Sequence, residues 1–256
     1  MKHTKNNSPL NKKYLFLGKA LLFPKEKILV IGDLHLGYEE KLRKQGLAIP
    51  LNQLQEVKEE IRAIFKNIKA RGIKIEKIVF IGDIKHGFGP DYEEKKQIND
   101  LIGFIRKDLK IKMQNLIFIR GNHEKNSPEG YYCDYYIEKD IAFVHGHKDY
   151  AEIYDKNINL IVMGHLHPTV TLRDGMKVKA EKYKCFLVGR YKKKDFVVMP
   201  SFLNITEGVS ANEFDDYIGG GFDFSIVPNK ELPSFEVFIC QDLDNALDFG
   251  KLKDIS

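Results

Sequence analysis

The feature that most constrains the fold is a series of short apolar runs, each followed closely by acidic, amide or histidine side chains. The runs at 27–31, 77–81, 116–119, 141–145 and 160–163 have the length and composition of buried strands. Two intervening segments, 51–71 and 92–109, have apolar residues at helical spacing, and Gly72 closes the first of them. Strand–helix–strand order predicts parallel strands in the first half of the chain.

The second half of the chain differs, because short strand-like runs follow one another with only turns between them. These runs are 131–137, 169–172, 185–188, 196–199, 222–227 and 235–240. A chain that opens as α/β and closes rich in strands fits a two-sheet sandwich flanked by helices. No Pro/Gly-rich linker divides it, so we predict one domain over 1–256, with 1–12 as a loose tail.

Composition and the N-terminal residues argue against a membrane-spanning or secreted protein. Apolar residues make up 43% and charged residues 30%, which is typical of globular proteins, and no apolar run approaches the roughly 20 residues of a membrane span. The polar N-terminus lacks the apolar core of a signal peptide, so we expect a cytoplasmic protein without a membrane partner. The net charge of +5 fits an anionic substrate without proving one.

Seven of the eight histidines fall in five short polar motifs. The motifs are Asp33-Leu-His35, Asp83-Ile-Lys-His86, Asn122-His123, His145-Gly-His147 and His165-Leu-His167. They follow the predicted strands, and ligands of open α/β sheets bind at this carboxyl edge. A single Asp-x-His or His-x-His pair is weak evidence, but five such motifs in strand–turn order are hard to attribute to coincidence.

The residue types suit a pair of divalent ions. Carboxylates bind hard ions, and imidazoles bind Mn, Fe, Co, Ni and Zn. Two ions held about 3.5–4 Å apart need a shared ligand, and Asp83, the only carboxylate of its motif, is the candidate bridge. Asn122 offers a neutral oxygen that adds no charge to a crowded site.

The ordered segments GDLHLG, GDIKHG, RGNHE, VHGH and GHLHP resemble the calcineurin-like metallophosphoesterase family over about residues 28 to 200. The resemblance implies an α/β fold (α+β in some schemes), a four-layer αββα sandwich, and two divalent metals, with Mn favoured over Fe, Co, Ni or Zn. It implies a first metal held by Asp33, His35, Asp83 and His167, and a second held by Asp83, Asn122, His145 and His165. His123 would be the catalytic histidine rather than a ligand.

The mechanism implied is hydrolysis by a metal-activated hydroxide that attacks phosphorus, with His123 placed to protonate the leaving oxygen. Because the histidine ligands must be neutral, activity should fall in acid. Four further side chains are candidates for substrate contact: Lys85, His86, Arg120 and His147. The alternatives for Lys85 and His86 are a supporting hydrogen bond or an exposed loop position, and for Arg120 a surface cation.

The segment GDIKHGFG with GNHE and GHLHP looks most like the archaeal SbcD-related branch of the family, whose bacterial relatives accompany DNA ligases or helicases. This resemblance implies a phosphodiesterase or nuclease that acts on DNA or RNA, with a helicase or another DNA-repair protein as partner. A phosphodiesterase or phosphatase for small or cyclic nucleotides is the first alternative. The second is a non-catalytic scaffold that kept the fold.

Overall fold

The computed structural model describes residues 13–47, 52–89, 91–124, 132–173, 179–204, 208–213 and 225–255. The tail predicted at 1–12 and residues 222–224 of a predicted strand lie outside these ranges. Residues 225–227 have no strand structure, so the prediction of a strand there was wrong. None of the helices in the described part of the chain combines the length and the apolar character that crossing a bilayer requires.

The first sheet carries the parallel strands that the sequence predicted. Its order is β1-β2-β3-β4-β5-β6, in which β3 to β6 run parallel and β1 and β2 form an antiparallel hairpin. The strands are β1 (Leu15–Leu17), β2 (Ala20–Phe23), β3 (Ile28–Ile31), β4 (Lys77–Ile81), β5 (Leu116–Ile119) and β6 (Tyr132–Cys133).

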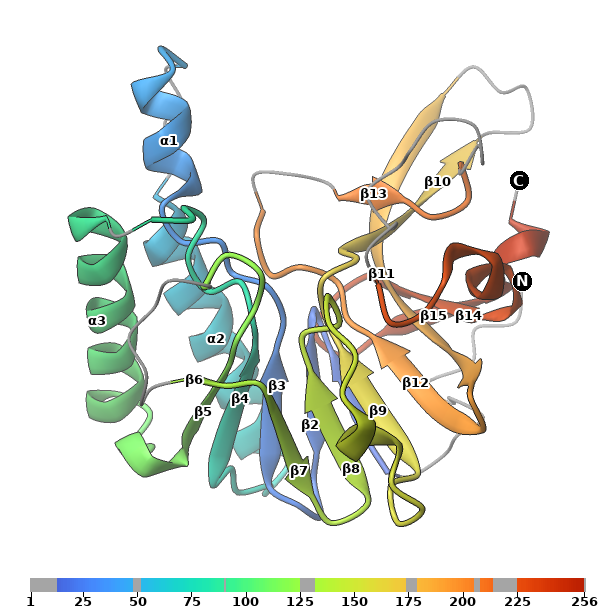
Figure 1. The fold of residues 1–256 in the computed structure, drawn as a ribbon. Coiled ribbons are helices and arrows are strands. Elements are labelled where there is room, and N and C mark those ends of the chain that lie inside the picture. Colours follow the sequence, from blue (N-terminus) through green and yellow to red (C-terminus); the bar gives the residue numbers. More distant parts are fainter. Residues whose placement is uncertain are drawn as a thin grey trace.

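Three α-helices lie beside this sheet; the two longer ones cover its outer face, and the short one rises beyond its end (Figure 1). They are α1 (Tyr38–Lys44), α2 (Gln53–Ala70) and α3 (Tyr92–Lys107), and a 3-10 turn, η1 (Met113–Asn115), precedes β5. The Asn52 side chain caps α2 by accepting from Gln55 N, and Asp91 caps α3 by accepting from Glu93 N and Glu94 N. The buried stripe of α2 has the helical spacing that the sequence predicted: Val57, Ile61, Ile64 and Ile68.

The second sheet has the order β13-β10-β11-β12-β9-β8-β7, and β14 pairs with β11 and β15. Strand β9 runs parallel to both β8 and β12, while the other long pairs are antiparallel. The strands are β7 (Tyr135–Glu138), β8 (Ile141–Val144), β9 (Leu160–Met163), β10 (Pro168–Arg173), β11 (Ala180–Tyr191), β12 (Lys194–Val198), β13 (Val209–Ser210), β14 (Glu236–Cys240) and β15 (Ala246–Lys251).

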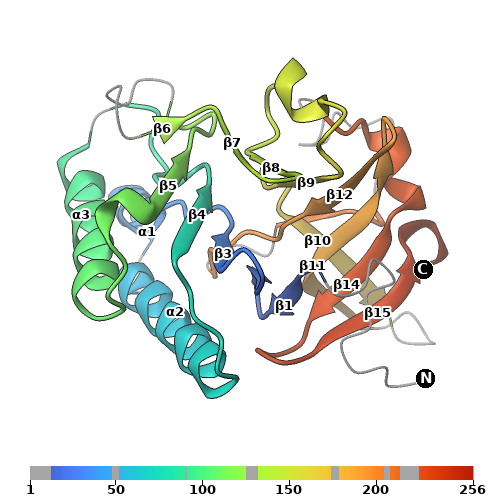
Figure 2. The same cartoon turned by 90° about the horizontal axis from the view of Figure 1, so that it is seen from below.

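The two sheets face each other across a buried apolar layer (Figure 2). Alternation along β3 explains the layering, because Ile28 and Val30 enter the layer between the sheets while Leu29 and Ile31 pack under the helices. The mixed α/β fold with two stacked sheets is therefore confirmed. In the described ranges the outer face of the second sheet is covered not by α-helices but by 3-10 turns: η2 (Ala151–Tyr154), η3 (Asn229–Ser234) and η4 (Leu252–Asp254).

Candidate metal centre

Five loops follow β3, β4, β5, β8 and β9, and backbone hydrogen bonds join them in pairs. Leu34 N and His35 N both donate to Asp83 O, at 3.1 and 2.8 Å. Gly164 N donates to His145 O at 3.1 Å, which joins the loops of the second sheet in the same way. The predicted side chains therefore project from neighbouring strand ends into a shared space.

A first group of donor atoms comes from Asp33, His35 and His167, whose side chains converge from both sheets. His35 Nε2 lies 3.3 Å from His167 Nε2, and His167 Nε2 lies 3.4 Å from Asp33 Oδ1. His165 N lies 3.3 Å from both Asp33 carboxylate oxygens, so the backbone orients this carboxylate. Asp33 is fully buried.

A second group of donor atoms comes from Asp83, His145 and His165, with Asn122 beside them. His145 Nδ1 lies 3.0 Å from Ile81 O, and a carbonyl only accepts, so Nδ1 carries the hydrogen. The other ring nitrogen, Nε2, faces Asn122 Oδ1 at 3.0 Å and His165 Nδ1 at 3.2 Å.

Asp83 lies between the two groups. His123 N donates to Asp83 Oδ1 at 3.0 Å, which leaves the other oxygen directed into the site. Asp83 Oδ2 lies 3.4 Å from His145 Nε2 in the second group and 3.9 Å from His35 Nε2 in the first. This placement fits a carboxylate shared by two cations.

The donor set fits divalent metals on chemical grounds. Asp83 Oδ2, Asn122 Oδ1 and His145 Nε2 converge, and when His145 is neutral a bound cation would satisfy the lone pairs of all three. Two donors that share one ion with bonds of about 2.1 Å lie about 3.0–3.4 Å apart. Five of the distances between donor atoms at this site run from 3.0 to 3.4 Å, and all donor atoms of each group lie within 4.8 Å of one another.

The electrostatics of the groups point the same way. Burial would lower the pKa of His145, but the carboxylates of Asp83 and Asp33 outweigh it and raise that pKa to about 9. Burial and His167 lower the pKa of His35 to about 3, and burial and His145 lower the pKa of His165 to about 4. Two buried carboxylates thus face neutral imidazoles with one candidate cation, His145, and further positive charge would stabilise the arrangement.

Four of these side chains sit on strained backbone. The φ angles are 46° at His35, 42° at Asp83, 70° at His165 and 45° at His167, all in the left-handed region that residues with a Cβ rarely adopt. Each such residue costs of order 1–3 kcal/mol, and the surrounding contacts must compensate. Gly164 shows how tightly they pack, because a Cβ there would lie 2.5 Å from Asp33 Oδ2.

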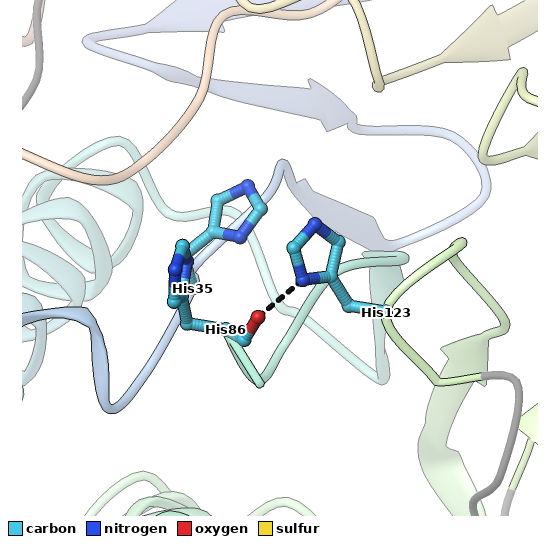
Figure 3. Close-up of side chains that lie close together, drawn as sticks. All are labelled: His35, His86 and His123. Carbon is cyan, nitrogen blue, oxygen red and sulfur yellow. Dashed lines mark hydrogen bonds between the residues drawn. The ribbon is translucent and has the colours of Figure 1, made fainter. Parts of the chain in front are cut away.

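His123 adjoins the two donor groups, and its ring nitrogens form a third cluster with those of His35 and His86 that could also hold a cation. Figure 3 shows His35, His86 and His123 side by side, with His123 Nδ1 hydrogen-bonded to His86 O. Since a carbonyl accepts, Nδ1 carries the hydrogen, and His123 Nε2 lies 3.7 Å from Asp83 Oδ2. His123 is therefore held at the edge of the donor groups by its backbone N and by one ring nitrogen.

Residues 26–184 match the family profile described as calcineurin-like phosphoesterase, which is more than half of the chain. The chain belongs to this family. The match supports a hydrolase of phosphate esters that uses divalent metals. No curated protein matches the chain significantly.

Solved structures share the phosphoesterase fold at low identity. The nuclease MPE of Pseudomonas putida aligns with a TM-score of 0.57 and 15% identity, covering 91% of this chain and 94% of that one. Zinc-bound Vps29 of Entamoeba histolytica aligns with a TM-score of 0.39 and 15% identity, covering 87% and 99% of the two chains. The first likeness supports the fold, and the second is too weak to carry an argument.

The four predicted substrate contacts of this phosphoesterase have different surroundings. Lys85 Nζ donates to Gly87 O and Gly89 O, and Lys85 is 8% exposed, which fits the alternative of a supporting hydrogen bond. Arg120 donates to Glu124 O at 3.1 Å and its Nε lies 3.5 Å from Asp134 Oδ1, so part of its guanidinium group is used within the protein.

The two histidines among these four lie at the site itself. His86 Nε2 is 3.1 Å from Lys41 Nζ, and burial followed by the Lys41 charge lowers the pKa of His86 to about 4. The His147 ring lies 5.1 Å from the His145 ring, beside the second donor group. Both remain candidates for substrate contact.

Sequence reasoning assigned no role to Glu124, which organises this phosphoesterase site. Glu124 is fully buried, and its carboxylate accepts from the backbone N of Asp83, Ile84, Lys85 and Gly121 at 2.8–3.2 Å. Burial and the charge of Asp83 raise the pKa of Glu124 to about 7. The only sequence signal was an acidic residue directly after Asn122-His123.

Glu124→Gln should destabilise the protein and weaken metal binding together. An amide has one acceptor oxygen, and its NH₂ would face backbone N–H groups, so we expect a loss of about 2–4 kcal/mol of unfolding free energy. Because Glu124 orients Asp83, metal affinity should fall roughly 10–100-fold. Denaturant unfolding and metal titration measure the two effects. The exposed Glu59→Gln on α2 is the control, and equal behaviour of the two variants would contradict this role for Glu124.

Proposed function

We propose that the chain is a dinuclear, divalent-metal phosphodiesterase that cleaves DNA or RNA. One observation carries this proposal. Two groups of donor atoms meet at Asp83, which belongs to the second and lies 3.9 Å from His35 of the first. His123, which is in neither group, lies 3.7 Å from Asp83 Oδ2. A hydrolase of phosphate esters needs a cationic site for phosphate oxygens and a nearby proton donor for the leaving group.

The chain's own residues position the reacting groups. Asp33, His35, Asp83 and His167 would hold one ion, and Asp83, Asn122, His145 and His165 the other. When bound, the ions supply positive charge for phosphate oxygens and lower the pKa of a water nucleophile. The backbone amides of His123 and His165 and the carbonyl of Ile81 orient Asp83, Asp33 and His145, respectively.

His123 would hold the proton for the leaving oxygen. The carbonyl of His86 takes the hydrogen on Nδ1, so the ring cannot turn without losing that bond. Nε2 is left facing the site, where in the imidazolium form it donates a proton to the departing alkoxide.

Charge and fold support a nucleic-acid substrate. The net charge is +5, and the last turn of α1, close after His35, carries Lys41, Arg43 and Lys44. The Pseudomonas putida protein with this fold is named a nuclease. Manganese as the metal, membership in the SbcD-related branch, a helicase or other DNA-repair partner and a cytoplasmic location belong to the same proposal.

Hydrolysis assays with defined esters test the proposal. Protein loaded with Mn²⁺ should cleave a bis-aryl phosphodiester and labelled oligonucleotides faster than an aryl phosphomonoester. Preference for the monoester, or for a cyclic nucleotide over every oligonucleotide, would contradict the proposed substrate. Failure to cleave any ester while two ions per chain are bound would favour the non-catalytic scaffold.

A further inference from the structure

An exposed aromatic side chain, Phe88, stacks on His123. The two ring centroids lie 4.3 Å apart with an interplanar angle of 19°. Phe88 is 58% exposed, whereas the other large apolar side chains around the site, such as Leu34 and Ile84, are fully buried. A large apolar ring in solvent forgoes the burial that stabilises most phenylalanines, so its position beside the proposed proton donor needs an explanation.

The loop that carries Phe88 is held rigidly from both sides of that residue. Lys85 Nζ donates to Gly87 O at 2.6 Å and to Gly89 O at 2.9 Å, so one ammonium group is hydrogen-bonded to both residues that flank Phe88. Gly87 N donates to Glu94 Oε1 at 2.6 Å, and His86 N donates to Leu36 O at 2.9 Å. A side chain displayed on such a loop is preorganised, and binding to it would cost little ordering entropy.

The same loop also positions His123. His86 O accepts from His123 Nδ1, so the carbonyl that orients the proposed proton donor lies two residues before Phe88. The same short, hydrogen-bonded loop therefore holds both the Phe88 ring and the ring of His123 in place. A group that stacks on Phe88 would therefore lie close to His123, the proposed proton donor for the leaving oxygen.

We infer that Phe88 is a stacking surface for the nucleobase next to the scissile phosphate, which makes unpaired nucleotides the preferred substrate. This inference rests on the proposed function. Stacking on an aromatic ring is sequence-tolerant, because every base has a π-face. A base inside a duplex has both faces covered by its neighbours, so it would have to leave the base stack before it could bind Phe88. Bases in single strands and at frayed duplex ends would not.

The experiment compares a single-stranded oligonucleotide with a matched one that contains one abasic nucleotide, and reads cleavage at each phosphate. Phe88→Ala should lower kcat/KM at phosphates next to normal bases by about 5- to 100-fold, as for other base-stacking aromatics. At the phosphate next to the abasic unit the same variant should match the wild type. Phe88→Tyr should retain wild-type rates on both substrates.

Tyr92→Ala is the matched control, because Tyr92 is a 78% exposed aromatic at the start of α3 and has no assigned role in catalysis. It should leave both rates unchanged. If Phe88→Ala slows both substrates equally, Phe88 only positions His123 and the inference is wrong. If wild-type protein cleaves duplex interiors as fast as single strands, the inference is also wrong while the proposed function stands. Wild-type protein that cleaves no phosphodiester would overturn both.

Discussion

Asp83→Asn should leave the protein with at most one metal ion per chain and lower turnover by roughly 10³-fold or more, because several kcal/mol of metal-derived transition-state stabilisation would be lost. Asparagine has nearly the shape of aspartate and can keep the hydrogen bond from His123 N. However, it places an uncharged group where Oδ2 lies 3.4 Å from His145 Nε2 and 3.9 Å from His35 Nε2. Elemental analysis after dialysis against Mn²⁺ measures the ion count.

Asp149→Asn is a suitable control for this variant. Asp149 is a half-exposed surface carboxylate that pairs with Lys192 Nζ at 2.9 Å, and neither donor group contains it. This variant should keep two ions per chain and wild-type turnover. Two ions bound tightly to Asp83→Asn would show that Asp83 is not the shared ligand.

His123→Ala should lower turnover by roughly 10²–10⁴-fold while both ions remain bound. The reason is that His123 belongs to neither of the two groups that meet at Asp83, although its ring lies with those of His35 and His86 in a third cluster. Its Nδ1 bonds His86 O, so only Nε2 is available to the site. Steady-state rates with metal content measured on the same samples test this expectation.

The leaving group provides an internal control for His123→Ala. An aryl phosphodiester that releases a stable phenolate needs little protonation, so its hydrolysis should suffer less than that of an oligonucleotide. Loss of metal from the variant would reassign His123 to the ligands. Equal losses on both substrates would rule out its role as proton donor.

Much of the fold could be predicted from sequence, because buried strands and helices place their apolar residues at characteristic spacings. The apolar runs at 77–81 and 116–119 correspond to β4 and β5, and the helical spacing in 51–71 corresponds to α2. Two parts of the fold have no clear pattern of this kind in the sequence. The residues before Lys27 form β1 and β2, an edge hairpin, and α1 spans seven mostly charged residues after Gly37, whose φ of 92° gives the chain its turn.

Residues that act through contacts were the hardest to predict. Glu124 and Phe88 stand out in the folded molecule because of four backbone hydrogen bonds and one stacked histidine, none of which is encoded in local spacing. Lys85 looked like a phosphate contact beside Asp83, but its ammonium group lies against two backbone carbonyls. The sequence gives the chemical type of each side chain, but the groups that it contacts depend on which loops lie next to one another in the folded chain.

By itself, the sequence determined the parallel strands of the first half, the identity of the oxygen and imidazole donors and their place after buried strands. These follow from hydrophobic periodicity and from the chemistry of each side chain, both of which are local. Only the tertiary structure decided that Asp33 and His167, from different sheets, approach to 3.4 Å, and that Asp83 lies between two donor groups. Such distances depend on how two sheets pack against each other, and that packing is a property of the whole folded chain.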